Sequence, residues 1–273
     1  MTVWQALILG IVQGITEFLP ISSSGHLLLI PELFGWEAQP LSFDVALHAG
    51  TALAVITYFW GDWWLLIRES LGDLRRHRLR LSSWGPYGHL MLLIALGTVP
   101  AVIAGLGLAS LEERLRTPGV VAAMLVLVGG YMAAAERWAS HPDKPGLEQI
   151  RWPGALFVGV AQACALVPGV SRSGSTIATG MFAGLSRAAA ARFSFLLATP
   201  VTVAAMLKEL PELRHAGEQG ITGLEIAVGV VASFIVGVGA IRFLLRYLTA
   251  RSLYPFVVYR VALAIVVVVV LVR

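Results

Sequence analysis

The stretch that decides the fold is QGITEFLPISSSGH, residues 13–26. An apolar segment leads into it and carries Gln13 and Glu17, whose spacing places both side chains on one face of a helix. Pro20 predicts that this helix ends just before it, and a serine cluster, a glycine and His26 follow. Ionisable groups inside apolar sequence are costly, so they usually face a cavity or mark a functional site.

A second copy of the stretch lies in the other half of the chain. Residues 10–25 align without a gap on residues 159–174, and five of these sixteen positions are identical. The identities pair Gly10 with Gly159, Gln13 with Gln162, Ser22 with Ser171, Ser24 with Ser173, and Gly25 with Gly174. The copies differ in charge, because Glu17 has no acidic counterpart and Arg172 stands where the first copy has Ser23. One copy therefore brings an acid and the other a fixed cation.

The composition is that of a polytopic membrane protein. The 273 residues are 57% hydrophobic and 13% charged, whereas soluble domains carry about 25% charged residues. No basic segment precedes the first apolar run, so we expect no cleavable signal peptide. The single Cys164 excludes a disulfide framework. We interpret the net charge of +4 as topology and headgroup contact, not as nucleic-acid binding.

Six apolar segments are long enough to cross a bilayer, which takes about 20 residues. The predicted spans are 43–67, 89–108, 120–135 with its flanks, 191–207, 224–241 and 256–272. Shorter apolar segments at 3–18 with 24–34, and at 152–167 with 176–185, predict two re-entrant helical hairpins. Such hairpins are allowed where irregular backbone is covered by protein or lines a cavity. The polar stretches at 68–80, 208–222 and 242–251 are predicted to be loops.

The predicted fold class is an all-α polytopic membrane protein that forms one integral membrane domain. Its first repeat covers about 1–139 and its second about 150–273. An odd number of spans separates the two hairpins, so the second hairpin enters from the opposite side and the repeats have inverted topology. The arginine-rich stretches at 68–80 and 242–251 are predicted to be cytoplasmic, which puts both termini outside.

The charged residues of the two breaks indicate a phosphate site. Glu17 beside a serine cluster and a histidine favours function over helix packing. A helix start rich in serine and glycine caps the helix and also gathers N–H donors for a phosphate. Arg172 lies in a glycine-rich break, and guanidinium binds phosphate bidentately. Asp44 and His48, one turn apart at the start of a span, are interpreted as interfacial or packing residues.

The two motifs resemble those of the undecaprenyl-diphosphate phosphatase family, also known as bacitracin-resistance proteins. The second is similar to that family's PGxSRSGxT motif, present here as residues 168–176. The first is similar to its (E/Q)xxxE motif followed by a Pro-x-Ser-Ser-x-Gly-His turn, carried here by Gln13, Glu17, Pro20, Ser22, Ser23, Gly25 and His26. The resemblance covers the whole length of the chain.

The resemblance implies hydrolysis of undecaprenyl diphosphate to undecaprenyl phosphate and phosphate, which recycles the lipid carrier for cell-wall synthesis and gives bacitracin resistance. It also implies a divalent cation, Mg²⁺ or Ca²⁺, and a site open to the outer face of the bacterial cytoplasmic (inner) membrane. By motif position, the implied catalytic residues are Glu17, Ser23, His26 and Arg172, and the implied phosphate-binding residues are Arg172, Ser171, Ser173, Gly174 and Thr176. Glu17 is the implied metal ligand, and Gln13 stays open as a second.

Several alternatives stay open at this point. The nucleophile is either Ser23, with His26 as its base and Glu17 orienting that base or binding metal, or an activated water. A polyprenyl-phosphate transporter or flippase is the alternative function, because many secondary transporters have inverted repeats. A type 2 phosphatidic acid phosphatase is rejected, since no histidine follows Ser173 before position 184. The expected partners are the polyprenyl diphosphate and membrane lipids, with no nucleic acid, and a homodimer stays open.

Overall fold

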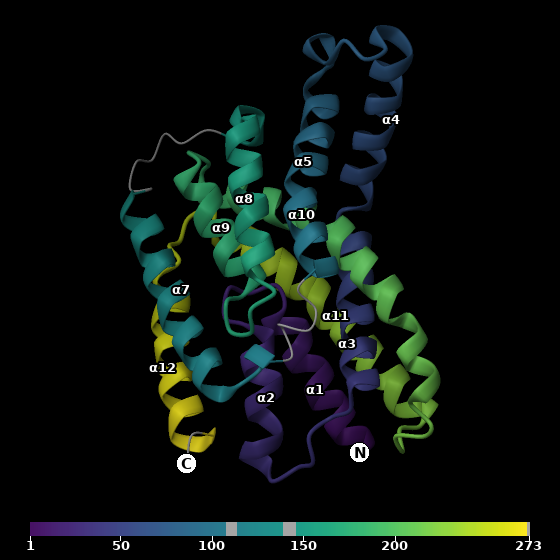
Figure 1. The fold of residues 1–273 in the computed structure, drawn as a ribbon, viewed down its shortest axis with the longest axis vertical. Helices are drawn as coiled ribbons and strands as arrows, with labels where there is room; N and C mark the ends of the chain where they lie inside the picture. The colour runs from purple at the N-terminus through teal and green to yellow at the C-terminus, as the bar shows by residue number, and fades with distance from the viewer. Residues whose placement is uncertain (108–113, 139–145, 272–273) are drawn as a thin grey trace.

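The computed structural model describes residues 1–107, 114–138 and 146–271, and within these ranges it contains helices and no strand (Figure 1). The α-helices are α1 (Val3–Thr16), α2 (Ser23–Phe34), α3 (Leu41–Tyr58), α4 (Trp60–His77), α5 (Pro86–Gly107), α7 (Pro118–Trp138), α8 (Trp152–Cys164), α9 (Arg172–Phe182), α10 (Arg187–Glu209), α11 (Gly223–Tyr247) and α12 (Tyr254–Leu271). Short 3-10 turns occupy Leu81–Ser83, Leu147–Gln149 and Leu210–His215.

The described chain contains 6 helices that are long and apolar enough to cross a membrane. They are α3, α5, α7, α10, α11 and α12. The predicted all-α, multi-pass architecture is therefore confirmed. Helices α1 and α8 have 14 and 13 residues, which is short of the roughly 20 that a span requires. Each is followed by a break in the helix, as the sequence predicts.

The bounds of two predicted elements are wrong. The predicted first span, 43–67, is interrupted at Phe59, between α3 and α4. Helix α4 then continues to His77, so most of the predicted loop at 68–80 is helical and lies beside α5 (Figure 1). Hydropathy missed the break because the apolar run continues through the tryptophans that begin α4. Likewise, α11 extends to Tyr247, so the first half of the predicted loop at 242–251 is helical.

The two short helix pairs approach each other from opposite ends of the molecule. In Figure 1, α1 and α2 lie in the lower half, near both termini, while α8 and α9 lie in the upper half. Helix α1 packs mainly against α11, and α8 packs mainly against α5, so each short helix packs against a span from the other half of the chain. This reciprocal packing agrees with the predicted inverted topology.

Aligned positions of the two copies have matching local structure. Ser22 and Ser171 have φ angles of 76° and 69°, in the left-handed region that residues other than glycine rarely adopt. Each is the last residue before a helix of the second arm, α2 or α9. A left-handed residue at this point turns the chain sharply, which allows a new helix to start next to the old one. These matches support the internal repeat.

The aligned glycines also make equivalent contacts. A Cβ on Gly10 would lie 2.7 Å from the carbonyl oxygen of Gly229 in α11, and a Cβ on Gly159 would lie 2.3 Å from that of Gly97 in α5. Glycine is therefore required at both crossings, because no other residue permits so close an approach of the backbones. The close crossings fix the depth at which each break lies.

The largest apolar core surrounds the middle of α10 and directly supports the first break. Phe193, Phe195 and Leu197 of α10 are almost completely buried. The ring of Phe195 packs edge-on against Phe18, with 5.8 Å between the ring centroids. Phe18 follows Glu17, so core packing holds the backbone that carries this carboxylate.

Candidate functional site

The two helix breaks contact each other at the centre of the molecule. The backbone N–H of Gly169 donates to Ser24 Oγ at 3.1 Å, and Ser173 Oγ donates to the carbonyl oxygen of Leu19, also at 3.1 Å. Residues far apart in the sequence thus satisfy one another's backbone groups, as irregular backbone at membrane depth requires. The break of each copy is folded against the break of the other.

Arg260 of α12 donates hydrogen bonds to backbone carbonyls of both breaks. Its side chain is completely buried and donates to the carbonyl oxygens of Pro20 at 3.4 Å, Gly169 at 2.9 Å and Val170 at 3.2 Å. Further donation reaches two carbonyl oxygens of α7, those of Met124 and Leu125. A guanidinium has five N–H donors, so one side chain can serve carbonyls from three segments. Sequence analysis missed Arg260, although a lone arginine inside an apolar span is itself a signal.

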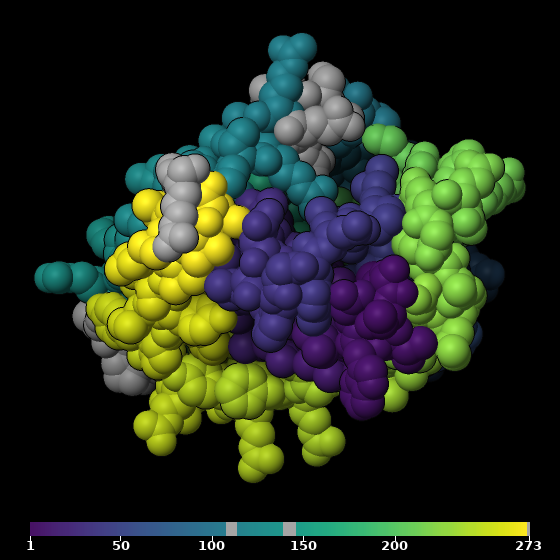
Figure 2. All heavy atoms as spheres, turned by 90° about the horizontal axis from the view of Figure 1, so that it is seen from below, coloured from purple at the N-terminus to yellow at the C-terminus, as the bar shows by residue number. Residues whose placement is uncertain are grey.

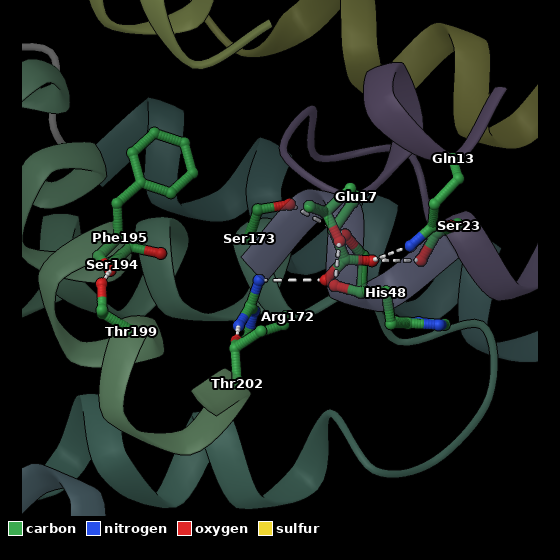
Figure 3. A network of polar contacts seen from close by, with 12 residues as sticks. Gln13, Glu17, Ser23, His48, Arg172, Ser173, Ser194, Phe195, Thr199 and Thr202 are labelled. Atoms are coloured by element: carbon green, nitrogen blue, oxygen red, sulfur yellow. Dashed lines mark hydrogen bonds and ion pairs between the residues drawn. The ribbon is translucent and has the colours of Figure 1, made fainter. Parts of the chain in front are cut away.

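Glu17 joins the residues that the two motifs were predicted to supply (Figure 3). Its Oε2 accepts from Ser23 Oγ at 2.8 Å and from Gln13 Nε2 at 3.3 Å, while its Oε1 accepts from Arg172 Nη2 at 3.0 Å. Arg172 also donates to the hydroxyl of Thr202 in α10. The side chains of Glu17 and Arg172 are only 13% and 17% exposed, so water screens this ion pair weakly.

Glu17, Ser23, Arg172 and Thr202 line a cavity of about 310 Å³, whereas Gln13 is buried behind Glu17 and is not part of the lining. One part of the lining is polar: Glu17, Ser22, Ser23, Ser24, Asp44, His48, Arg116, Ser171, Arg172, Thr202 and Glu209. The other part is apolar: Leu27, Leu41, Val45, Ala165, Leu166, Val201, Ala205 and Met206. The cavity is therefore amphipathic, which suits a ligand with an anionic head and an apolar tail.

The cavity lies toward the end of the molecule that carries both termini. Its lining includes Leu41, the first residue of α3, and Glu209, the last of α10, and both helix ends lie at the lower end of the molecule in Figure 1. Seen from below in Figure 2, α2 occupies the middle of this face, between α12 in yellow and the green segment that follows α10.

The predicted phosphate-binding residues divide into two groups. Ser171 and Arg172 line the cavity. Ser173, Gly174 and Thr176 do not, and their polar groups stabilise the second break instead. Gly174 N–H donates to Ser171 Oγ at 3.3 Å, and Thr176 Oγ1, which is fully buried, donates to the carbonyl oxygen of Arg172 at 2.6 Å. These three residues shape the loop that presents Arg172.

His26 does not face Ser23, contrary to the arrangement that the sequence suggested. Its Nδ1 lies 2.7 Å from the carbonyl oxygen of Ser22, and its Nε2 lies 2.7 Å from the hydroxyl of Tyr259 in α12. A carbonyl oxygen only accepts, so Nδ1 carries the proton and Nε2 accepts from the Tyr259 hydroxyl. The reason is that α12 packs against α2 and engages the ring. The catalytic role of His26 stays a prediction, while the group bonded to Ser23 is Glu17.

The residues around Glu17 fit a hard divalent cation. Gln13 Oε1 is buried without a hydrogen-bond partner among the described residues, and Gln13 contacts Glu17 through its other amide atom. No cluster of three acidic, histidine or cysteine side chains occurs in the part of the chain that the structure describes. This donor set resembles the Mg²⁺ mode in which one or two protein oxygens, several waters and substrate phosphates complete the coordination.

Comparisons with known proteins place the chain in a family. Residues 6–266 match the family described as "Bacitracin resistance protein BacA". The undecaprenyl-diphosphatase of Pelotomaculum thermopropionicum is 43% identical over 98% of this chain and 97% of its own length. Those of Idiomarina loihiensis and Trichlorobacter lovleyi are 43% and 44% identical, over 96% and 97% of this chain and 96% of their own lengths.

We expect Arg260→Met to destabilise the protein strongly, because each buried carbonyl left without a donor costs about 1–3 kcal/mol. Arg260→Lys offers fewer donors in a different geometry, so its unfolding temperature should lie between those of Arg260→Met and the parent protein. Thermal unfolding of the purified protein in detergent measures both effects. Arg246→Met in exposed sequence at the end of α11 is the control. An Arg260→Met protein that melts with the parent would show that the carbonyls do not depend on the guanidinium.

Proposed function

The chain belongs to the bacitracin resistance protein BacA family, and we propose that it hydrolyses undecaprenyl diphosphate to undecaprenyl phosphate and inorganic phosphate. The observation that carries this proposal is the meeting of Glu17, Ser23 and Arg172 in one amphipathic cavity. The relatives' name, undecaprenyl-diphosphatase, supports it. By this activity the protein recycles the lipid carrier for cell-wall synthesis and confers bacitracin resistance.

The polar part of the cavity suits the diphosphate. Arg172 offers a planar guanidinium, and Ser23 and Ser171 line the same cavity. Such preorganised donors stabilise the charge that develops on a transferring phosphoryl group. The cavity is far too small for a C55 chain, so the chain leaves along the apolar part and extends into the bilayer. We do not favour the transporter alternative, because the relatives are named for hydrolysis.

The hydrogen bond between Ser23 and Glu17 defines two routes for the phosphoryl transfer. In the first, Ser23 Oγ attacks the terminal phosphorus and its proton passes to Glu17, the acceptor at 2.8 Å. The bond from this phosphorus to the bridging oxygen breaks, undecaprenyl phosphate leaves, and water then hydrolyses the phosphoserine. In the second route, Glu17 activates a water that attacks the same phosphorus directly. Glu17 is the proposed base in both routes, and its hydrogen bond from Ser23 supports this role.

We also propose that a divalent cation, Mg²⁺ or Ca²⁺, takes part. Glu17 would hold it, with Gln13 Oε1 as a second ligand and the substrate phosphates as further ones. A bound cation would polarise phosphoryl oxygens and offset the substrate's negative charge. Glu17 keeps its bond to Ser23 through only one carboxylate oxygen, which leaves the other for Arg172 or the cation.

The purified protein should release phosphate from undecaprenyl diphosphate in detergent. Chelation of divalent cations should abolish this release, and added Mg²⁺ or Ca²⁺ should restore it. Glu17→Gln is the inactive control, since both routes need the carboxylate. Absence of phosphate release from folded protein supplied with cation would contradict the hydrolase assignment, and release unaffected by chelation would contradict the cation.

We expect Arg172→Lys to lower kcat/KM by about 10²–10³, the cost of one lost transition-state donor. Lysine keeps the charge but loses the planar fork that grips phosphate at two points. Arg192→Lys is the matched control. Arg192 lies on α10 and, like Arg172, pairs with an acidic side chain, here Asp62, but it lies outside this cavity. Near-normal activity of Arg172→Lys would assign Arg172 to structure.

The Ser23→Ala variant separates the two routes. If the serine attacks, this variant should be inactive, and acid quenching of the parent enzyme should trap phosphoserine at Ser23. If water attacks, Ser23→Ala should retain measurable turnover. The predicted role of His26 is tested in the same series: a double Ser23→Ala/His26→Ala variant no worse than Ser23→Ala indicates that the two act as one unit. Activity of Glu17→Gln equal to the parent would contradict both routes.

We propose that the protein lies in the bacterial cytoplasmic (inner) membrane with this cavity open to the outer face. The end of α4 and the turn after it carry Arg75, Arg76, Arg78 and Arg80, at the end of the molecule opposite to both termini (Figure 1). The positive-inside rule places that end in the cytoplasm. A cysteine at position 77 should resist a membrane-impermeant thiol reagent in intact cells, and one at position 214 should react. The reverse pattern would invert the orientation.

A further inference from the structure

One ring nitrogen of His48, a residue that lines the cavity, has no hydrogen-bond partner among the described residues. His48 lies on α3, lines the cavity, and stands beside Glu17 and Ser23 in Figure 3. Its Nδ1 lies 2.7 Å from the backbone carbonyl oxygen of Asp44, one turn earlier in the same helix. Since a carbonyl oxygen only accepts, Nδ1 carries a proton and Nε2 is the free nitrogen. No hydrogen bond to Nε2 is found among the described residues.

This arrangement differs from that of His26. The ring of His26 also bonds a carbonyl oxygen one turn back through Nδ1, but its Nε2 is bonded to Tyr259. A histidine with both nitrogens bonded to protein has a structural role. Among the described residues, His48 has only one such bond, and its side chain lines a cavity that contains ionic groups. The bond to Asp44 fixes the ring orientation, which keeps Nε2 available to a ligand.

The charges of the cavity bear on how it receives a diphosphate. The lining holds two fixed cations, Arg116 and Arg172, against three carboxylates, Glu17, Asp44 and Glu209. Arg172 is paired with Glu17 at 3.0 Å and Arg116 with Asp44 at 3.0 Å. Among the described residues, the lining therefore carries one more negative than positive side chain before the proposed divalent cation binds. His48 is the only histidine that the structure describes in this lining, and it adds a polar group that does not repel a phosphate.

We propose that His48 Nε2 binds a phosphate group of the substrate by a hydrogen bond, an inference that rests on the proposed function. The bond does not depend on which partner holds the proton. An imidazolium donates to a phosphate oxygen, and a neutral imidazole accepts from a protonated phosphate. In either case one proton is shared between His48 and the phosphate. This proton reduces the repulsion between the anionic head and the carboxylate of Glu17. His48 is thus a third point of phosphate contact, from α3, beside Arg172 and Ser23.

The test compares His48→Ala with His48→Gln, because glutamine offers an amide donor and acceptor of similar reach. With undecaprenyl diphosphate, His48→Ala should raise KM about 10- to 100-fold, the loss expected for one hydrogen bond to a charged group, with a smaller effect on kcat. His48→Gln should recover most of this loss. His89→Ala is the matched control, since His89 makes the same kind of bond, to Gly85 at 3.2 Å, and lines a different cavity.

A binding measurement separates this inference from the hydrolase assignment. Inorganic pyrophosphate should raise the unfolding temperature of the parent protein, His48→Gln and His89→Ala, and should raise that of His48→Ala much less. If the parent releases no phosphate but shows this pattern, the proposed function fails and the phosphate contact stands. If the parent is active and His48→Ala keeps the parent KM and pyrophosphate protection, or His48→Gln is as impaired as His48→Ala, the contact is refuted.

Discussion

The fold is held together at its centre by Arg260, a buried cation whose partners among the described residues are backbone carbonyls and not carboxylates. Two helix breaks at the centre of an apolar protein expose backbone carbonyls that neither helices nor water can satisfy. Arg260 meets this requirement by donating to carbonyl oxygens of both breaks and of α7. A single guanidinium on α12 therefore fixes the relative positions of two segments that are far apart in the sequence. The site in front of the breaks inherits its geometry from this contact.

The charges of the candidate site are divided between the two halves of the chain for a related reason. Glu17 comes from the first copy of the motif and Arg172 from the second, and each is unpaired within its own copy. An isolated charge at this depth is expensive, so folding the two breaks together lets each charge find its partner. The same ion pair then lies at the polar end of an amphipathic cavity, where a phosphate can compete for the guanidinium. The Glu17–Arg172 ion pair thus both stabilises the contact between the two breaks and positions the guanidinium for a phosphate.

Two histidines illustrate how packing between helices assigns function. His26 lies inside the motif, yet α12 engages its ring through Tyr259. His48 lies outside the motif, yet α3 passes the first break and His48 lines the cavity. Both residues have the same local bond through Nδ1, so the difference comes only from what the neighbouring helices present to Nε2. Proximity in sequence to Ser23 was a poor guide to proximity in space.

The amino-acid sequence alone predicted the membrane class, six spans, two helix breaks and a site that includes Glu17, Ser23 and Arg172, three side chains that the structure brings together. Spans and helix breaks can be predicted because hydropathy and proline are local signals. The two motifs can be recognised because they place charged residues in otherwise apolar sequence. Only the tertiary structure decided that α3 ends at Phe59, that Ser173 and Thr176 lie behind the cavity, and that Arg260 joins the breaks. These features depend on which way a side chain points once helices from both halves pack together. That direction is set by contacts across the repeat, which no local pattern records.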